Sequence, residues 1–190
     1  MSKTKTKDRG RYGLSRYFLL TALLSFLGWC FETGYLWLRT GNVYDSGFMT
    51  LPFCPIYGCC LVAIYLLMGT PHKPKGILKT VAPAVLRYAL YLALAFFIPS
   101  LLEYLVGLFF DKTFRMRLWD YTGAPYNLDG YVCLPVSLAW AGLIFVFMRF
   151  GFLPLKGLVG KIPKPLAVGL SIVLIVVFAV DIGANVVKTL

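Results

Sequence analysis

Three acidic residues stand inside long apolar stretches of this 190-residue chain, which has only eight Asp and Glu in total. They are Glu32, Glu103 and Asp181. An ionised carboxylate in hydrocarbon costs several kcal/mol unless it is paired, protonated or in contact with water. Carboxylates in such a place can bind a cation, carry a proton, or act as general acid and base. These three residues are therefore the first candidates for functional groups.

Spacing along the chain places other polar or aromatic side chains beside the first acid. Gly28, Glu32 and Tyr35 stand at i, i+4 and i+7, which is one face of a helix. Trp29 flanks that face. This pattern predicts a polar and aromatic strip on one helix.

The other two acids also have informative neighbours. Glu103 follows Pro99 by one helical turn, and a proline leaves a helical carbonyl unpaired, which makes room for a polar site. Asp181 is followed one turn later by Asn185. We therefore expect each acid to be presented by a different helix.

The elements that position these acids are predicted to cross a membrane. The chain is 59% hydrophobic with a mean hydropathy of +0.75, too apolar for an ordinary soluble domain. At about 20 residues per crossing, we expect an all-α bundle of about five transmembrane helices. The expected spans are residues 17–38, 48–68, 82–110, 130–150 and 166–187. The third contains Pro99, so we expect one tilted, kinked helix, with two shorter passes as the alternative.

The positive charge predicts orientation. The net charge is +11, and most of the 19 Lys and Arg lie before the first span or near the connections between spans two and three and between spans four and five. By the positive-inside rule, the N-terminus is cytoplasmic and the C-terminus external. Residues 1–15 form a basic cytoplasmic tail and residues 16–190 a single transmembrane domain. This distribution argues against nucleic acid as a partner and favours some attraction to anionic lipid.

In this topology all three acids lie in the outer half of the bilayer, beneath the external loops 41–58 and 111–130. Both loops are rich in Gly, Pro and aromatic residues, which suit ordered turns and the membrane interface. Asp120, Tyr121 and Asn127 are expected to close a site from above. The alternative is that Glu32 and Glu103 pair with Arg39, Arg115 or Arg117, or accept hydrogen bonds from Tyr and Trp donors, and so lock helices together. Asp181, nearest the interface, suits a structural role best.

Signatures of several enzyme classes are missing from the sequence. His72 is the only histidine and falls in a cytoplasmic connection, so we expect no external catalytic triad and no histidine metal site. A phosphate loop would need Gly at Leu155 and Ser or Thr at Ile162. We expect no metal, no cofactor and no intrinsic ATPase. Paired carboxylates still leave an intramembrane enzyme open.

The cysteines do not follow a metal-binding pattern. Cys54 and Cys133 both fall near the external face, where a disulfide between them is an open alternative. Cys30, Cys59 and Cys60 are expected to pack as small apolar residues.

Ordered motifs give the chain a family resemblance. They are G-W-x-x-E-x-x-Y from Gly28, G-F at Gly47, P-x-C-P-I-Y-G from Pro52, L-L-E-Y from Leu101, W-D-Y-T from Trp119 with P-Y-N from Pro125, S-L-x-W from Ser137, and the late Asp181. Over roughly residues 20–185 the chain resembles the family of small bacterial membrane proteins called "putative ABC-transporter type IV". The resemblance implies a multi-pass protein of the bacterial cytoplasmic membrane with a role in transport.

We predict a permease-like component of a transport system with an outward-facing acidic and aromatic pocket for a polar or cationic small solute. The alternatives are an intramembrane enzyme or lipid-binding protein of the cell envelope, and a non-catalytic assembly or sensor subunit. Expected partners are the lipid bilayer, a separate ATPase or other membrane subunit, and further copies of the chain. The candidate binding or proton-coupling residues are Trp29, Glu32, Tyr35, Tyr57, Glu103, Trp119, Asp120, Tyr121, Asn127 and Asp181.

Overall fold

The computed structural model describes residues 13–42 and 47–189, except the side chain of Arg39. Most of the expected basic tail, residues 1–15, lies outside the described residues. The helices are α1 (Leu14–Thr40), α2 (Pro55–Met68), the short 3-10 helix η1 (Gly76–Lys79), α3 (Ala84–Phe114), α4 (Leu134–Phe150), α5 (Phe152–Gly160) and α6 (Lys164–Thr189). The predicted all-helical architecture is confirmed. One small antiparallel hairpin, β1 (Asn127–Leu128) with β2 (Val132–Cys133), interrupts it between α3 and α4.

Three described helices are long and apolar enough to cross a bilayer: α1 over Leu14–Leu38, α3 and α6. A fourth crossing results if α4 and α5, which are bent by 49° at Gly151, count as one broken span. The expected span 48–68 is helical only from Pro55, and its 14 residues make α2 short for a crossing of about 30 Å at 1.5 Å per residue. The described helices therefore support three to four spans, and the fifth remains a prediction.

Helix α3 is a single continuous helix of 31 residues with Pro99 inside it. The expectation of one helix rather than two short passes is thus confirmed. At 1.5 Å per residue, 31 residues extend for about 46 Å, well beyond the hydrocarbon thickness, so the helix must tilt or project. The Ser100 hydroxyl donates to the Phe96 carbonyl at 2.7 Å, beside the proline.

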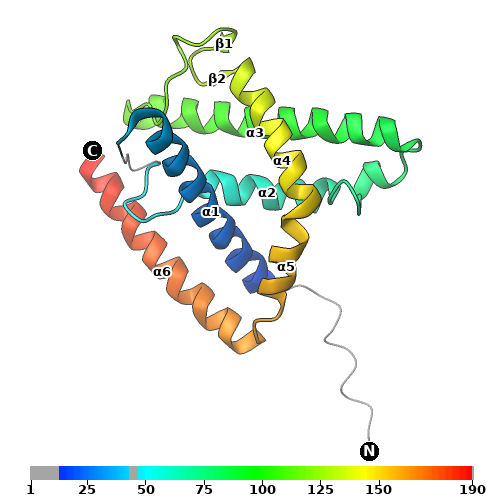
Figure 1. Ribbon diagram of the computed structural model, residues 1–190. Coiled ribbons are helices and arrows are strands. Elements are labelled where there is room, and N and C mark those ends of the chain that lie inside the picture. Colours follow the sequence, from blue (N-terminus) through cyan, green and yellow to red (C-terminus); the bar gives the residue numbers. More distant parts are fainter. Residues whose placement is uncertain (1–12, 43–46, 190) are drawn as a thin grey trace, which may run out of the picture.

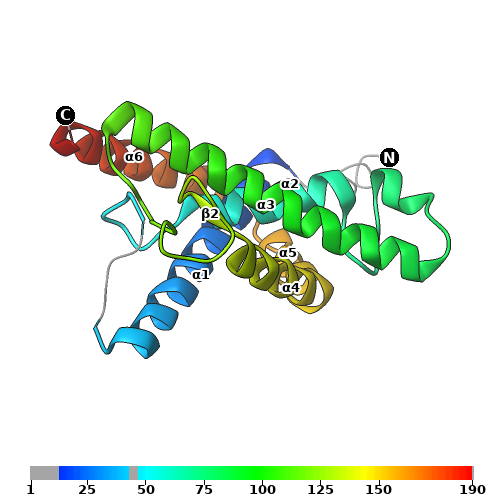
Figure 2. The same cartoon turned by 90° about the horizontal axis from the view of Figure 1, so that it is seen from above.

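Helices α1 and α6 pack together near their N-terminal ends and diverge beyond (Figures 1 and 2), and polar contacts hold α6 near both of its ends. At one end the Arg16 guanidinium donates to the Ile162 carbonyl just before α6, at 2.9 Å. At the other, the backbone N–H of Thr50, in the segment that follows α1, donates to Asp181 near the end of α6, at 3.1 Å. Figure 2 shows α3 passing over this group as a long diagonal, and Figure 1 shows α4 crossing in front of α3.

Small residues let α1 and α2 approach closely. A Cβ added at Gly58 would lie 2.2 Å from the Thr21 carbonyl oxygen, and one at Gly28 would lie 2.5 Å from the ring of Tyr57. Glycine at a helix crossing allows such backbone contact, and here it sets Tyr57 against α1 one turn before Glu32.

The buried core lies where α1, α2 and α3 meet α4 and α5. Its fully buried side chains include Leu20, Ile64, Tyr91, Met148 and Phe152. Tyr91 satisfies its hydroxyl by donating to the Gly69 carbonyl at 3.2 Å. The cavity described next begins beside this core.

Candidate functional site

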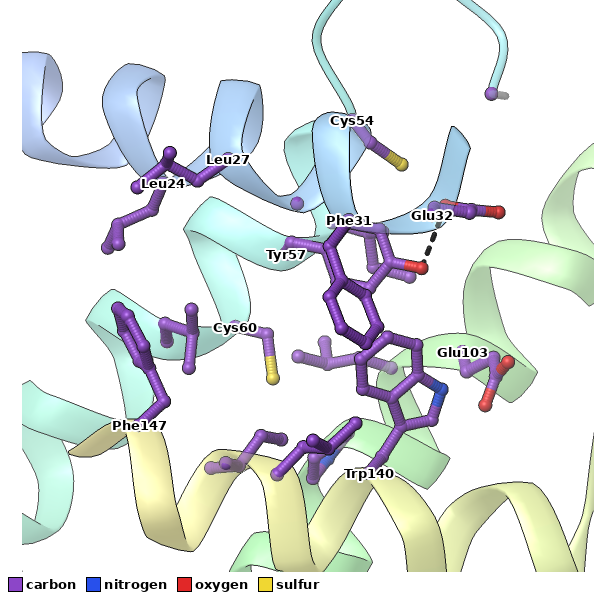
Figure 3. Close-up of a pocket in the computed structure, with 18 of the residues that line it drawn as sticks. Leu24, Leu27, Phe31, Glu32, Cys54, Tyr57, Cys60, Glu103, Trp140 and Phe147 are labelled. Atoms are coloured by element: carbon purple, nitrogen blue, oxygen red, sulfur yellow. Dashed lines mark hydrogen bonds between the residues drawn. The ribbon is translucent and has the colours of Figure 1, made fainter. Parts of the chain in front are cut away.

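Glu32 on α1 and Glu103 on α3 line the same cavity, which has a volume of about 530 Å³. Residues of α1, α2, α3 and α4 form its wall, together with Gly47 and residues of the loop after α3. Figure 3 shows the two carboxylates at one end of the cavity, with the Trp140 side chain beside them. Two acids separated by 71 positions in the sequence are thus brought into one space.

A tyrosine of α2 holds the first glutamate. The Tyr57 hydroxyl donates a hydrogen bond of 2.8 Å to Oε2 of Glu32, the dashed line in Figure 3. The Tyr57 ring packs on the Trp140 ring with centroids 5.1 Å apart. The close approach at Gly28 fixes the base of this tyrosine, so the position of its hydroxyl follows from helix packing.

A tyrosine of the loop after α3 holds the second glutamate. The Tyr121 hydroxyl donates to Oε1 of Glu103 at 3.1 Å. Burial, followed by the nearby Glu103 charge, raises the pKa of Tyr121, so its hydroxyl keeps the proton that it donates. The loop is itself anchored, because the backbone N–H of Tyr121 donates to the Gly130 carbonyl at 2.9 Å. Trp119, which also lines the cavity, donates its indole N–H to the Tyr131 carbonyl at 2.7 Å.

Neither cavity glutamate forms a salt bridge with a cation among the described side chains. The single ion pair there joins Arg117 to Asp120. The pairing of Glu32 or Glu103 with Arg115 or Arg117 is therefore not observed, and the side chain of Arg39 lies outside the described residues. The tyrosine donors that the helix-locking alternative also expects are observed at both glutamates. The described residues that line the cavity include no Lys, Arg or His. Because a carboxylate can accept more hydrogen bonds than the one each tyrosine supplies, both glutamates have acceptor capacity for a ligand.

Asp181, the third acid, lies outside the cavity lining. It accepts the Thr50 backbone N–H at 3.1 Å and the Asn185 amide at 3.4 Å. The Thr50 hydroxyl completes the group by donating to the Asn185 amide oxygen at 3.1 Å. This cluster fastens the segment before α2 to α6.

Two of the predicted loop contacts shape the loop from outside the cavity. Asp120 accepts the Thr122 backbone N–H at 2.9 Å and the Arg117 guanidinium at 3.1 Å. The Thr122 hydrogen bonds, ahead of the Arg117 charge, lower the pKa of Asp120. Asn127 donates to the Thr122 carbonyl at 3.2 Å and accepts the Gly130 N–H at 3.2 Å. Both side chains are exposed and support the turn that carries Tyr121.

The polar and aromatic strip predicted on α1 is only partly at the cavity. Trp29 and Tyr35 are outside its lining. Trp29 stacks on Phe26 with ring centroids 6.4 Å apart, and the side chain of Tyr35 is 54% exposed. Phe31, which sequence reasoning did not select, lines the cavity and packs on Trp140 at 5.9 Å. Trp140 was present in the S-L-x-W motif, but nothing in the sequence placed it beside the acids.

Within the described residues, no group of three or more His, Cys, Asp or Glu side chains is arranged to hold a metal ion. Cys54 and Cys133 are both buried free thiols, so the disulfide considered from the sequence is not observed. Cys54 and Cys60 line the cavity as small side chains.

The apolar helices define an α-helical protein of the lipid bilayer, with an internal cavity that holds two acids. The chain belongs to the family described as "Putative ABC-transporter type IV", whose model matches residues 18–186. The family resemblance noted from the motifs is thereby confirmed. Neither the curated proteins nor the solved structures compared with the chain gave a match.

Proposed function

We propose that this protein is a membrane component of a transport system, and that its cavity binds a cationic or polar small solute. Glu32 and Glu103 are the central binding or proton-coupling groups. The observation that carries the proposal is that the two glutamates come from different helices and share one cavity, with no cation among the described residues that line it. Membership of a family named for transporters agrees with this role.

Charge balance favours a cationic ligand. Two ionised carboxylates in a largely apolar cavity repel each other and are poorly solvated, so the site gains free energy by taking up a proton or a cation. Neutral tyrosine hydroxyls orient Glu32 and Glu103 without neutralising them. A positively charged solute would neutralise these carboxylates, with which no described Lys or Arg side chain forms an ion pair.

The proposed arrangement in the membrane has five spans, with α2 and the segment before it as the short second one, and a cytoplasmic N-terminus. Arg16, Lys73, Arg149 and Lys156 near one set of helix ends support this orientation. Labelling of single introduced cysteines from either side of the membrane tests it. Labelling of the α2–α3 connection from outside would contradict it.

Energy for active transport would come from another subunit or from coupled protons. We propose that a separate ATPase, if one is used, docks on the basic surface formed by Lys73 and Lys75 in the α2–α3 connection and Lys156 on α5, where acidic partner residues would find complementary charge. A chain with so few helices also suits assembly with further copies of itself. Crosslinking and mass measurement of the purified complex test both partners.

The test of the binding role uses Glu32→Gln and Glu103→Gln, with Asp181→Asn as a matched control outside the cavity. Solute flux in cells or proteoliposomes should fall strongly in the two glutamine variants, while folding, followed by thermal unfolding in detergent, stays near that of the unchanged protein. If both variants fold and transport normally, the glutamates only lock helices and the proposal is wrong.

A second candidate function is an enzyme acting on a membrane-embedded substrate. The observation that favours it is the pair of carboxylates in one cavity, each hydrogen-bonded to a tyrosine hydroxyl, since such groups can exchange protons with a substrate. Unchanged solute flux together with altered envelope lipids in the glutamine variants would support this function over transport.

A further inference from the structure

The cavity has a polar end and an apolar end. Figure 3 shows Glu32 and Glu103 at one end and Leu24, Leu27 and Phe147 at the other, with Trp140 nearer the acids. The acids and their tyrosine partners occupy the polar end, whereas aliphatic and phenyl side chains continue the lining away from it. A ligand that fills this space needs a polar head and an apolar body.

One side of the cavity is open to the surroundings of the helices. The exposed side chains in its lining are Leu27 and Phe31 on α1, at 37% and 50%, and Leu143 and Val146 on α4, at 44% and 56%. All four lie inside apolar helices that are long enough to span a membrane, α4 as part of its bent pair with α5. With α1 and the bent pair of α4 and α5 across the bilayer, as proposed above, the opening between α1 and α4 faces hydrocarbon.

Helix packing explains why this side is open. Helix α1 packs mainly on α2 and α6, whereas α4 packs mainly on α3 and α5. Helices α1 and α4 thus face each other across the cavity, and their apolar side chains form its edges. A ligand dissolved in the bilayer can reach the acids through this opening without crossing a polar surface.

The aromatic side chains beside the acids suit an organic ammonium group. The Trp140 ring contacts Phe31 at 5.9 Å and Tyr57 at 5.1 Å between centroids, so three aromatic rings from three helices gather next to Glu32. Aromatic faces attract alkylated ammonium groups, which shed their hydration more easily than small inorganic cations. Carboxylates supply the opposite charge.

We propose that the cavity binds amphiphilic organic cations, with an ammonium head at Glu32 and Glu103 and an alkyl chain toward Phe147, and that they enter laterally from the bilayer between α1 and α4. This inference rests on the proposed function, because it names the chemical class of the solute. The inference also adds lateral entry from the bilayer, whereas a water-soluble solute would enter the cavity from water.

The test is equilibrium binding of radiolabelled dodecyltrimethylammonium to the full chain in nanodiscs of zwitterionic lipid, with empty nanodiscs subtracted. We expect saturable binding that is displaced poorly by tetramethylammonium, which has the head alone, and by dodecanol, which has the chain alone. Glu32→Gln combined with Glu103→Gln should weaken binding by roughly a hundredfold.

The route of entry is tested by Leu143→Trp, which adds bulk at the edge of the opening. It should slow association several-fold. The matched control is Leu170→Trp on α6, because Leu170 is similarly exposed, at 42% against 44%, and lies outside the cavity lining. Equal association rates in the two variants would overturn the lateral route.

Other outcomes overturn the ligand class. Binding no greater than to empty nanodiscs rules out the amphiphile, equal displacement by dodecanol leaves only an apolar cavity, and equal displacement by tetramethylammonium leaves a site for small cations.

The proposed function has its own contradicting outcome. If flux of a small polar cation falls in the glutamine variants while dodecyltrimethylammonium does not bind, the function stands and this inference fails. If the amphiphile binds but no flux depends on the glutamates, the transport function fails.

Discussion

Two residues of the 47–57 segment, Thr50 and Tyr57, form different kinds of hydrogen bond with intramembrane acids. The Thr50 backbone N–H donates to Asp181, whereas the Tyr57 hydroxyl donates to Glu32. Both acids stand on apolar helices, yet only Glu32 lines the cavity. A backbone donor that is held by a carboxylate fastens the chain, whereas a hydroxyl at a cavity wall leaves the carboxylate facing space for a ligand. Whether an intramembrane acid is a binding group or a structural group therefore depends on its hydrogen-bond partners and on whether it lines a cavity.

The largest effect should come from neutralising both cavity glutamates. Glu32→Gln with Glu103→Gln removes the charges that a bound cation would meet, at a cost of about 3 kcal/mol in binding, or roughly a hundredfold in affinity. Asp181→Asn should leave affinity within about twofold, since Asp181 is outside the lining. Isothermal titration or flux assays measure both. Equal losses in the two proteins would remove the distinction between the acids.

The second effect concerns how helix packing positions Tyr57. In Gly28→Ala the added Cβ would lie 2.5 Å from the Tyr57 ring, so the tyrosine must shift and its bond to Glu32 lengthen. We expect a loss of about 1–3 kcal/mol in stability, together with weaker ligand binding.

Gly34→Ala on the same helix is the matched control, because a Cβ there meets nothing within 4 Å. It should be neutral, or stabilising by up to about 1 kcal/mol through helix propensity. Thermal unfolding and ligand binding are measured for both variants. Equal stability and equal affinity would show that the close approach of Gly28 to Tyr57 does not position the tyrosine.

Breaking the Asp181 cluster should change stability more than function. Asp181→Ala removes the acceptor of the exposed Thr50 N–H, at a cost of about 1 kcal/mol for the lost hydrogen bond. Amide hydrogen exchange of the 47–54 segment should rise. An affinity loss as large as that of the glutamine variants would place Asp181 in the binding site after all.

The tyrosine hydroxyls should contribute less than the acids that they hold. Tyr57→Phe and Tyr121→Phe keep the rings and remove only the donors, each at about 1 kcal/mol, or a fivefold loss of affinity. Affinity measured for each single variant and the double variant checks this. Losses as large as those of the glutamine variants would make the hydroxyls direct ligands.

The smallest effect is expected at Asp120, which supports the loop from the exposed side. Hydrogen bonds from Thr122 lower the pKa of Asp120, so the ionised form is favoured in the folded protein. Its contribution is therefore present above the ordinary Asp pKa of about 3.9 and is lost as the pH falls through the lowered value. Hydrogen-exchange protection factors of residues 120–130, which are corrected for the intrinsic effect of pH on exchange, should be unchanged from pH 7 to pH 5 and fall only in stronger acid. Asp120→Asn should abolish that acid step, and a step near neutral pH would point to another group.

Much of the fold follows from local properties of the sequence. Apolar runs of sufficient length gave α1, α3 and α6, and Pro99 was compatible with one long helix as expected. The length of the expected second span was harder to predict. Pro52 and Pro55 delay the start of the helix until Pro55, and a hydropathy profile does not detect that loss of helical length. The bend between α4 and α5 at Gly151 depends on core packing around Phe152, which hydropathy also does not describe.

The sequence predicted the two cavity glutamates, but it predicted the other residues that line the cavity only in part. Tyr57, Trp119 and Tyr121 were selected and do line the cavity, whereas Trp29, Tyr35, Asp120, Asn127 and Asp181 are outside it. Phe31 is adjacent to Glu32 in the sequence but was not selected, since an aromatic residue in an apolar helix is ordinary. The functional roles of all these residues remain predictions.

The sequence by itself determined which segments are helices of a membrane protein and which acids are costly there, because hydrocarbon penalises every unpaired polar group wherever it stands. Only the tertiary structure decided that Glu32 and Glu103 share a cavity while Asp181 does not. Hydropathy fixes the depth of a residue in the bilayer, but the rotation of each helix about its axis depends on contacts between helices. Here those contacts are the approach of Gly28 to Tyr57, the Tyr121 hydrogen bond to Glu103, and the packing of Trp140 on Tyr57.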